Sequence, residues 1–240
     1  MAHIVVNGKL PKNPIVIEGF PSKGFVSTIA ANYMIREMGM KLAGFIDADE
    51  VGGIAVIKDS KPLRPVRIYV KDNFVLIYSE VTVPFNCIPK FSKVVNEWLE
   101  KLNPSMVVLM AGITGVEADK DHEILGVATT PALAKRLETA NVKMIKDGVL
   151  TGVSSNILLH CVENNIPTIG LMVQTEYTPD ALAAASMLDI LNRLLGVKVS
   201  VENLRGMGKD VEEEFKKIIK QMRKGKEGYV NMEDSCPMYG

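Results

Sequence analysis

The sequence predicts a three-layer α/β/α sandwich around a largely parallel or mixed sheet. Short β-rich runs alternate with stretches of helical periodicity along most of the chain, which is the pattern of sheets covered by helices. The run Met106–Met110 is entirely apolar, as is typical of a strand buried on both faces. At 240 residues, one large domain is favoured over two small ones.

The expected strands are short runs bounded by turn residues. They are Ile15–Glu18, Leu42–Ile46, Val66–Val70, Phe74–Tyr78, Met106–Met110, Ile124–Ala128 and Thr168–Val173. The stretch from 55 to 80, which includes the third and fourth of these, is expected to contain several strands. Asp72 and Asn73 form a tight turn between Val66–Val70 and Phe74–Tyr78.

Apolar residues at helical spacing predict the covering helices. The helices run from about Phe25 to Met38, from Ile88 to Leu102, from near Pro131, from near Val153, and from Pro179 through Leu195. Asn103 and Pro104 end the second helix. Thr178 is expected to cap the last one, with Pro179 in its first turn.

The C-terminal quarter differs in composition from the rest. Residues 201–224 predict a charged helical segment, acidic near Glu212–Glu214 and basic near its end, which suits the helix macrodipole. Its narrow apolar stripe, Val211–Met222, suits packing on a sheet or on a neighbouring subunit. We therefore divide the chain into an α/β domain (1–200), this helical segment (201–224) and a flexible tail (225–240).

Composition excludes several classes of partner. The 28 basic and 28 acidic residues balance, so no global field attracts nucleic acid or an anionic membrane. Apolar runs are too short to span a bilayer, and the N-terminus lacks a secretory signal pattern. Cys87, Cys161 and Cys236 are odd in number and widely spaced, which predicts a reducing, cytoplasmic location.

Two glycine-bounded turns follow predicted strands, where ligands bind in open α/β sheets. Gly19–Gly24 matches no phosphate-loop pattern, and Pro21 lacks a backbone donor, so we interpret it as a strand-to-helix turn with Ser22 near the cap. Gly112–Gly115, with Thr114, could line a small-molecule crevice but carries no base or nucleophile. The charged residues Glu117–Glu123 after it are interpreted as a solvated loop.

The remaining polar residues have simple structural interpretations. Ser154, Ser155 and Asn156 are expected to cap a helix, and Glu176 to bind a ligand or cap the helix after it. His160 and Cys161 fall in mid-helix, as core or interface residues. With His3 and His122, the histidines give no recognisable zinc set. We therefore predict no catalytic, metal or cofactor site.

The last three residues form the best functional candidate. Met238, Tyr239 and Gly240 present an apolar anchor, a phenol and a terminal carboxylate, which a partner can capture with backbone donors or a lysine. Fraying without function is the alternative for a chain end of this kind.

Several segments occur in an order that resembles one family. They are Gly19–Tyr33, Leu42–Asp47, Pro65–Val70, Asp147–Leu159, Asn165–Leu171 and Thr178–Leu191, which together cover roughly residues 13–200. This pattern is similar to the proteasome assembly chaperone 2 family, especially its archaeal members. The arginines Arg64, Arg67, Arg136 and Arg193 follow no phosphate-binding motif.

The resemblance implies a non-enzymatic protein with a fold like the purine nucleoside phosphorylase sandwich. Members bind the α-ring of the proteasome core particle as assembly chaperones or ATP-independent activators, and they form homo-oligomers. Met238, Tyr239 and Gly240 match the family's terminal hydrophobic–tyrosine–any motif, which inserts between adjacent α-subunits. Two alternatives stay open: an enzyme for a nucleoside-like molecule, using Gly112–Gly115 and Glu176, and an oligomeric scaffold with a masked tail.

Overall fold

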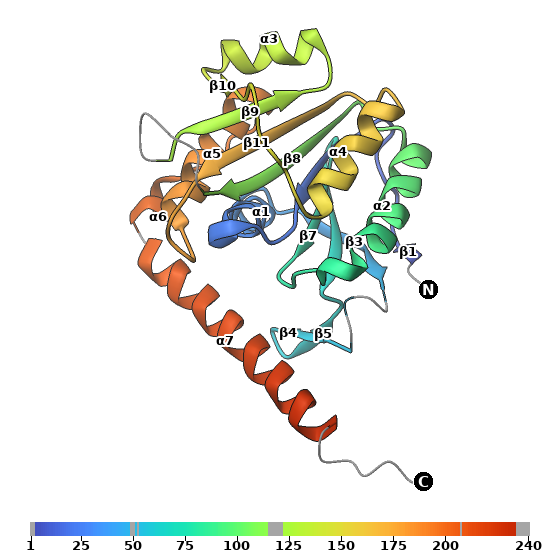
Figure 1. The fold of residues 1–240 in the computed structure, drawn as a ribbon, viewed down its shortest axis with the longest axis vertical. Helices are drawn as coiled ribbons and strands as arrows, with labels where there is room; N and C mark the ends of the chain where they lie inside the picture. The colour runs from blue at the N-terminus through green and yellow to red at the C-terminus, as the bar shows by residue number, and fades with distance from the viewer. Residues whose placement is uncertain (1–2, 49–50, 52, 115–121, 207, 234–240) are drawn as a thin grey trace.

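A nine-stranded mixed sheet forms the centre of the fold, and helices cover both of its faces (Figure 1). The computed structural model describes residues 3–48, 51, 53–114, 122–206 and 208–233. The sheet contains β1 (His3–Val6), β2 (Ile15–Gly19), β3 (Lys41–Asp47), β6 (Val66–Lys71), β7 (Phe74–Ser79), β8 (Met106–Ile113), β9 (Ile124–Ala128), β10 (Lys143–Met144) and β11 (Thr168–Gln174). The hairpin β4 (Val56–Lys58) and β5 (Lys61–Leu63) is separate from it. The predicted α/β sandwich is confirmed.

The strands follow the order β1-β3-β6-β7-β2-β8-β11-β9-β10. The four central strands β7, β2, β8 and β11 run parallel to one another. Towards the two edges the pairing becomes antiparallel, in β7–β6–β3–β1 and in β11–β9. All of the expected strands occur, and the sequence reading missed β1 and the two-residue β10, which both lie at edges of the sheet.

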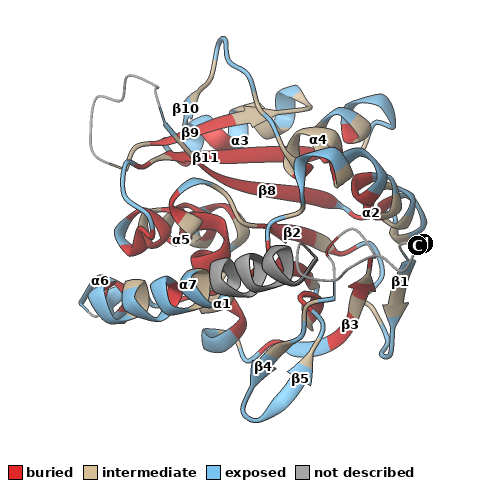
Figure 2. Ribbon diagram, turned by 60° about the horizontal axis from the view of Figure 1, so that its bottom comes forward, coloured by how far each residue is buried: buried red, intermediate tan, exposed pale blue. Residues whose placement is uncertain are grey.

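Helices pack on the sheet in two layers (Figure 2). They are α1 (Val26–Glu37), α2 (Ile88–Leu102), α3 (Pro131–Thr139), α4 (Val153–Glu163), α5 (Ala181–Leu195), α6 (Glu202–Gly206) and α7 (Gly208–Glu233), with 3-10 turns η1 (Lys23–Phe25) and η3 (Phe85–Cys87). The helices α1 and α5 share one large core cluster, and the helices α2 and α4 share a second.

Strand β8 shows how the sequence pattern produces the two cores. Val108 and Met110 pack into the cluster under α1 and α5, whereas Val107 and Leu109 pack into the cluster under α2 and α4. Side chains alternate between the faces of a strand, so both sets must be apolar where both faces are covered. The continuous apolar run therefore marks a central strand, as predicted.

Helix boundaries follow local signals, with one correction. Helix α2 ends at Asn103, whose φ of 48° is left-handed, as its Asn-Pro sequence predicts. Helix α5 was expected to be capped by Thr178, but its cap is Asp180, whose side chain accepts a hydrogen bond from the Ala183 amide. The Asp180 carboxylate is the better cap, because it reaches the amide of the third helical residue, in the first turn, at 2.9 Å.

The C-terminal segment is also longer than predicted. Its helix was expected to end near Lys224, followed by a flexible tail from 225, but α7 continues to Glu233. Residues 234–240 lie outside the described residues. The prediction took the loss of apolar periodicity as the end of the helix, but that periodicity marks only a face that packs on other elements, and Lys226, Glu227 and Glu233 are good helix formers without it.

Candidate functional site

The first candidate region is α7, the helix that leads towards the predicted binding residues. Its first half is fixed to the body: Phe215 is 2% exposed, and its ring lies 6.3 Å from that of Phe25. A carboxylate oxygen of Glu212 accepts a hydrogen bond from the Ala181 amide at 3.3 Å. Val211 packs against the same core cluster. The start of α7 is therefore held against α1 and α5.

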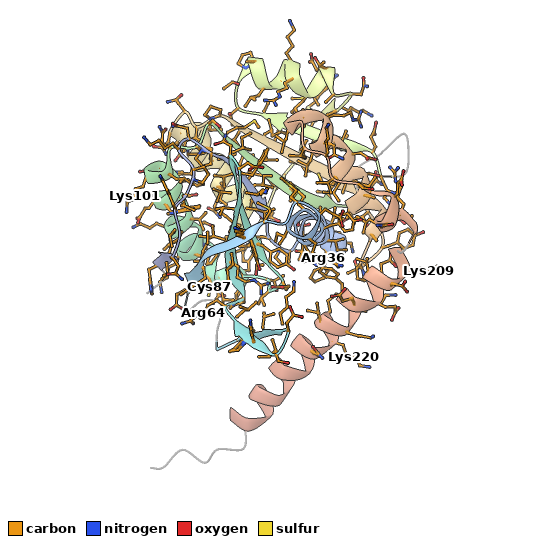
Figure 3. All side chains as sticks on the ribbon, turned by 180° about the vertical axis from the view of Figure 1, so that it is seen from behind. Arg36, Arg64, Cys87, Lys101, Lys209 and Lys220 are labelled. Atoms are coloured by element: carbon orange, nitrogen blue, oxygen red, sulfur yellow. The ribbon has the colours of Figure 1, made fainter. Side chains whose placement is uncertain are left out.

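Beyond Phe215 the helix leaves the body. Figure 1 shows α7 extending past the edge of the fold, and Figure 3 shows the same projection from behind, with Lys209 and Lys220 along it. From Phe215 to Glu233, an α-helix spans about 27 Å at its usual rise. Lys216 and Lys220 are exposed on this stretch.

The three residues predicted to bind a partner, Met238, Tyr239 and Gly240, lie outside the described residues. Their role therefore stays a prediction. What the structure contributes is the path before them, a helix that carries the chain away from the sheet as far as Glu233 (Figure 1).

The second candidate region is a cavity of about 820 Å³ at the carboxyl ends of β2 and β8. Its walls are the turn that follows β2, the segment Ala111–Thr114, the loop 145–152 and the first turn of α4. The predicted crevice at Gly112 and Thr114 therefore exists. Glu176, which the alternative of an enzyme requires beside this crevice, is exposed and is not among the described residues that line the cavity.

The cavity lies between two neighbouring parallel strands whose following connections lead to opposite sides of the sheet. Strands β2 and β8 are parallel neighbours, but after β2 the chain crosses through α1 to β3, and after β8 it continues to β9 on the other side. Connections that diverge from adjacent parallel strands leave an opening between them at their carboxyl ends. The topology of the sheet therefore creates this cavity.

The floor of the cavity depends on contacts between segments far apart in sequence. The Gly112 amide donates a hydrogen bond to Ser22 Oγ at 2.9 Å, and Ser22 Oγ lies 2.8 Å from Ser27 Oγ. A Cβ atom on Gly112 would lie 2.0 Å from the carbonyl oxygen of Lys23, so this close approach requires glycine. Ser22 lies at the cap position of η1, as predicted, but its hydroxyl makes no capping hydrogen bond and instead accepts one from the Gly112 amide of β8.

Glu18 lies buried beside this floor, at the end of β2, and is 1% exposed. One carboxylate oxygen accepts a hydrogen bond from the Phe20 amide at 2.7 Å, and the other accepts one from Ser154 Oγ at 2.8 Å. Burial raises the pKa of Glu18 to about 7, against the smaller opposing effect of these donors. Phe20 and Ser154 both line the cavity.

Sequence reasoning missed Glu18 and misread Ser154. The expected cap of α4 by Ser154, Ser155 or Asn156 is wrong: the cap is Gly152, without a side-chain hydrogen bond. Ser154 instead donates to Glu18 across 136 positions of sequence. A signal for Glu18 was available, since an acidic residue in an apolar parallel strand needs buried partners.

The predicted solvated loop after β8 also contains a structural residue. His122 Nε2 lies 3.1 Å from Asp180 Oδ2, which also accepts a hydrogen bond from Thr175 Oγ1 at 2.5 Å. Asp180 is 3% exposed. Because its other oxygen caps α5, the carboxylate ties three segments together, and the solvated interpretation is wrong for His122.

A buried ion pair explains one of the arginines without motif. Arg67 is 1% exposed, its guanidinium binds the Glu80 carboxylate, and it lies 5.1 Å from the centre of the Tyr78 ring. Burial, with the nearby Glu80 carboxylate, raises the pKa of Tyr78 well above its ordinary value. Arg67 therefore has a structural role between β6 and β7.

The described residues also bear on metal sites and on membrane-spanning helices. No three His, Cys, Asp or Glu side chains among them are grouped as a metal site. His160 Nε2 lies 3.1 Å from a Glu100 carboxylate oxygen, and Cys161 is buried in the α2–α4 core. Over the same residues, no helix combines the length and apolarity needed to cross a membrane.

Most of the described fold lies within a region that matches one protein family. The model of the PAC2 family matches residues 16–219, which include the sheet from β2 onwards without β1, both helical layers and the anchored start of α7. The chain belongs to the PAC2 family. A relative in Methanocaldococcus jannaschii, the uncharacterized protein MJ0106, is 30% identical over 234 residues, covering 95% of this chain and 93% of that protein.

Solved structures show the same PAC2 fold. PbaA of Pyrococcus furiosus, described as an archaeal homolog of proteasome-assembly chaperone, is 30% identical with a TM-score of 0.84, and the match covers 94% of this chain and 100% of that chain. PbaB of the same organism, described as an archaeal proteasome activator, is 20% identical with a TM-score of 0.75, covering 90% and 98%. At that lower identity, PbaB supports the fold alone.

Proposed function

We propose that the protein is a non-enzymatic proteasome assembly chaperone homologue that binds the α-ring of the core particle. In this proposal, Met238, Tyr239 and Gly240 insert between adjacent α-subunits, where a lysine meets the terminal carboxylate. Binding assists assembly or opens the gate without ATP, in the cytoplasm. The observation that carries the proposal is the likeness to PbaA, at 30% identity over nearly the whole of both chains.

The geometry of α7 supports the same proposal. The helix is anchored through Phe215 and Glu212 and then projects from the body (Figure 1). A rigid arm of this kind reduces the conformational entropy lost when a short terminal motif becomes ordered in a groove. Lys216 and Lys220 on this arm are exposed, so their charged side chains lie in solvent and not against the apolar core.

A homo-oligomer completes the proposed mechanism. A single three-residue anchor binds weakly, because ordering it costs much of the energy gained on contact. Several copies held together raise the effective concentration of each later contact and convert weak anchors into stable binding. The half-exposed side chains Ile218 and Ile219 on α7 offer an apolar surface for such an assembly.

The decisive test removes Met238–Gly240 and measures co-sedimentation of the purified protein with α-rings and with intact core particles. We expect loss of binding, with oligomer size and thermal unfolding unchanged. Met238→Ala and Met232→Ala form a matched pair, because both truncate a methionine but only the first lies in the proposed anchor. Unchanged sedimentation of the truncated protein would sink the proposal.

Two further measurements distinguish the alternatives. Protease accessibility of residues 225–240 in the native oligomer separates an exposed tail from a masked one. Electron microscopy of the protein with α-rings separates end-on binding from no binding. Hydrolysis of a fluorogenic peptide by the core particle, with and without the protein, separates gate opening from assistance in assembly.

A further inference from the structure

We propose that the cavity between β2 and β8 binds a small organic anion, with its carboxylate at the start of α4 and its apolar part against the apolar residues of the lining. This inference is independent of the proposed role of Met238–Gly240. It rests on the shape of the cavity, the distribution of polar and apolar groups around it, and the buried carboxyl group beside its floor.

The size and position of the cavity suit a small molecule. Its volume of about 820 Å³ falls within the range of ligand pockets, about 300–1,000 Å³. Its floor is held by the bond from the Gly112 amide to Ser22 and by the close contact of Gly112 with Lys23. Contacts within the chain therefore hold the site in shape, which lowers the cost of binding.

One wall of the cavity is apolar. Phe20 and Ile88 are largely buried, and the half-buried Val83 and Leu158 pack against the same core cluster. Phe20 is fixed by an edge-on contact with Phe91, 5.5 Å between ring centres. A ring or short alkyl group would remove the apolar surface of this wall from water, which favours binding.

The start of α4 and two lysines of the lining favour negative charge. Helix α4 begins at the cavity: Gly152, Val153 and Ser154 line it, and Gly152, as the cap, offers no side-chain acceptor to the amides of the first turn. Lys23 and Lys146 add two cations at the rim, and Asp147 offsets one of them. Together they favour a monoanion over a neutral molecule or a cation.

Glu18 makes the binding sensitive to pH. The groups that contact its carboxyl are uncharged: the Phe20 amide, the Met110 backbone and the Ser154 hydroxyl. The charged groups of the cavity lining are Lys23, Lys146 and Asp147. Since burial raises the pKa of Glu18 to about 7, the carboxyl is neutral below that pH and repels an anion above it.

The test uses benzoate, which stays ionised throughout the range, and benzamide as its uncharged isostere. Affinities of the full-length protein are measured by ligand-observed NMR between pH 6.0 and 8.0. We expect benzoate to bind more tightly than benzamide at pH 6.0 and to lose about tenfold by pH 8.0, as the neutral fraction of Glu18 falls. Equal affinities for the two compounds, or no binding, would overturn the proposal.

Variants locate the site and the pH sensor. Lys23→Ala with Lys146→Ala should weaken benzoate by about tenfold and leave benzamide unchanged, whereas Lys101→Ala, on α2 and outside the cavity lining, should change neither. Glu18→Gln should remove the pH dependence. Binding that survives the double lysine change, or a pH dependence that survives Glu18→Gln, contradicts the assignment.

Discussion

The cavity at the carboxyl edge of the sheet and the projecting helix α7 are built in opposite ways. The cavity joins segments that are far apart in sequence, through contacts such as Ser22 with Gly112 and Ser154 with Glu18. Past Phe215, α7 depends on local features, such as the ion pair of Lys216 with Glu213 three residues before it. The first is a preformed recess, and the second is an arm.

This difference separates two kinds of function within one chain. A preformed recess selects small ligands by shape and charge, because its walls are held before binding. A projecting helix presents a short motif to a large partner, and copies of it act together. The family match covers the residues that line the recess and ends at residue 219, so most of the arm lies beyond it, and the recess follows from the topology of the sheet.

The largest expected effect concerns the anchor of the arm. Phe215→Ala should lower the free energy of unfolding by about 4 kcal/mol, because it empties a fully buried aromatic site against Phe25. Ile219→Ala, on the same helix but half-exposed, is the control and should cost about 1 kcal/mol. Urea denaturation measures both, and equal effects would show that α7 is not anchored through Phe215.

A second expected effect tests the buried carboxyl beside the recess. The pKa of Glu18 is raised from 4.5 to about 7 by burial, so its contribution to stability is full below pH 4.5 and is lost as pH rises through 7. The loss corresponds to about 3 kcal/mol. Glu18→Gln should remove it, so the stability of the variant relative to the parent should rise between pH 4.5 and 8 in urea titrations.

Glu213→Gln on α7 is the matched control for that experiment. Hydrogen bonding to Lys216 lowers the pKa of Glu213, so any stability it adds is present above pH 4.5 and is lost as the pH falls through its lowered pKa. The sign is therefore opposite to that of Glu18. A similar pH profile for the two variants would remove the distinction between the recess and the arm.

The smallest expected effect probes the floor of the recess. Gly112→Ala places a methyl group 2.0 Å from the Lys23 carbonyl oxygen and should destabilise the protein by about 2 kcal/mol as the turn shifts. Gly206→Ala is the control, since nothing lies within 4 Å of its added Cβ. A thermal midpoint that falls for Gly112→Ala but not for Gly206→Ala is the predicted result.

Local patterns in the sequence were sufficient for most of the elements. The strand Met106–Met110 and the helix ending at Asn103 were predicted from apolar runs and from Asn-Pro, because burial and backbone preference act within a few residues. Capping was harder to assign. Ser22, Thr178 and Ser154 all have the right chemistry for a cap, but only the tertiary structure shows that none of the three side chains supplies the capping hydrogen bond.

The amino-acid sequence by itself determined the α/β class, the family and the candidate Met238–Gly240, since these depend on residue types and their order. Only the tertiary structure decided that Glu18 is buried beside a cavity, that Asp180 caps α5, and that α7 runs on to Glu233 as a projecting arm. The physical reason is distance along the chain. Partners such as Glu18 and Ser154 meet only when the sheet brings them together, and their pKa values and hydrogen bonds follow from that meeting.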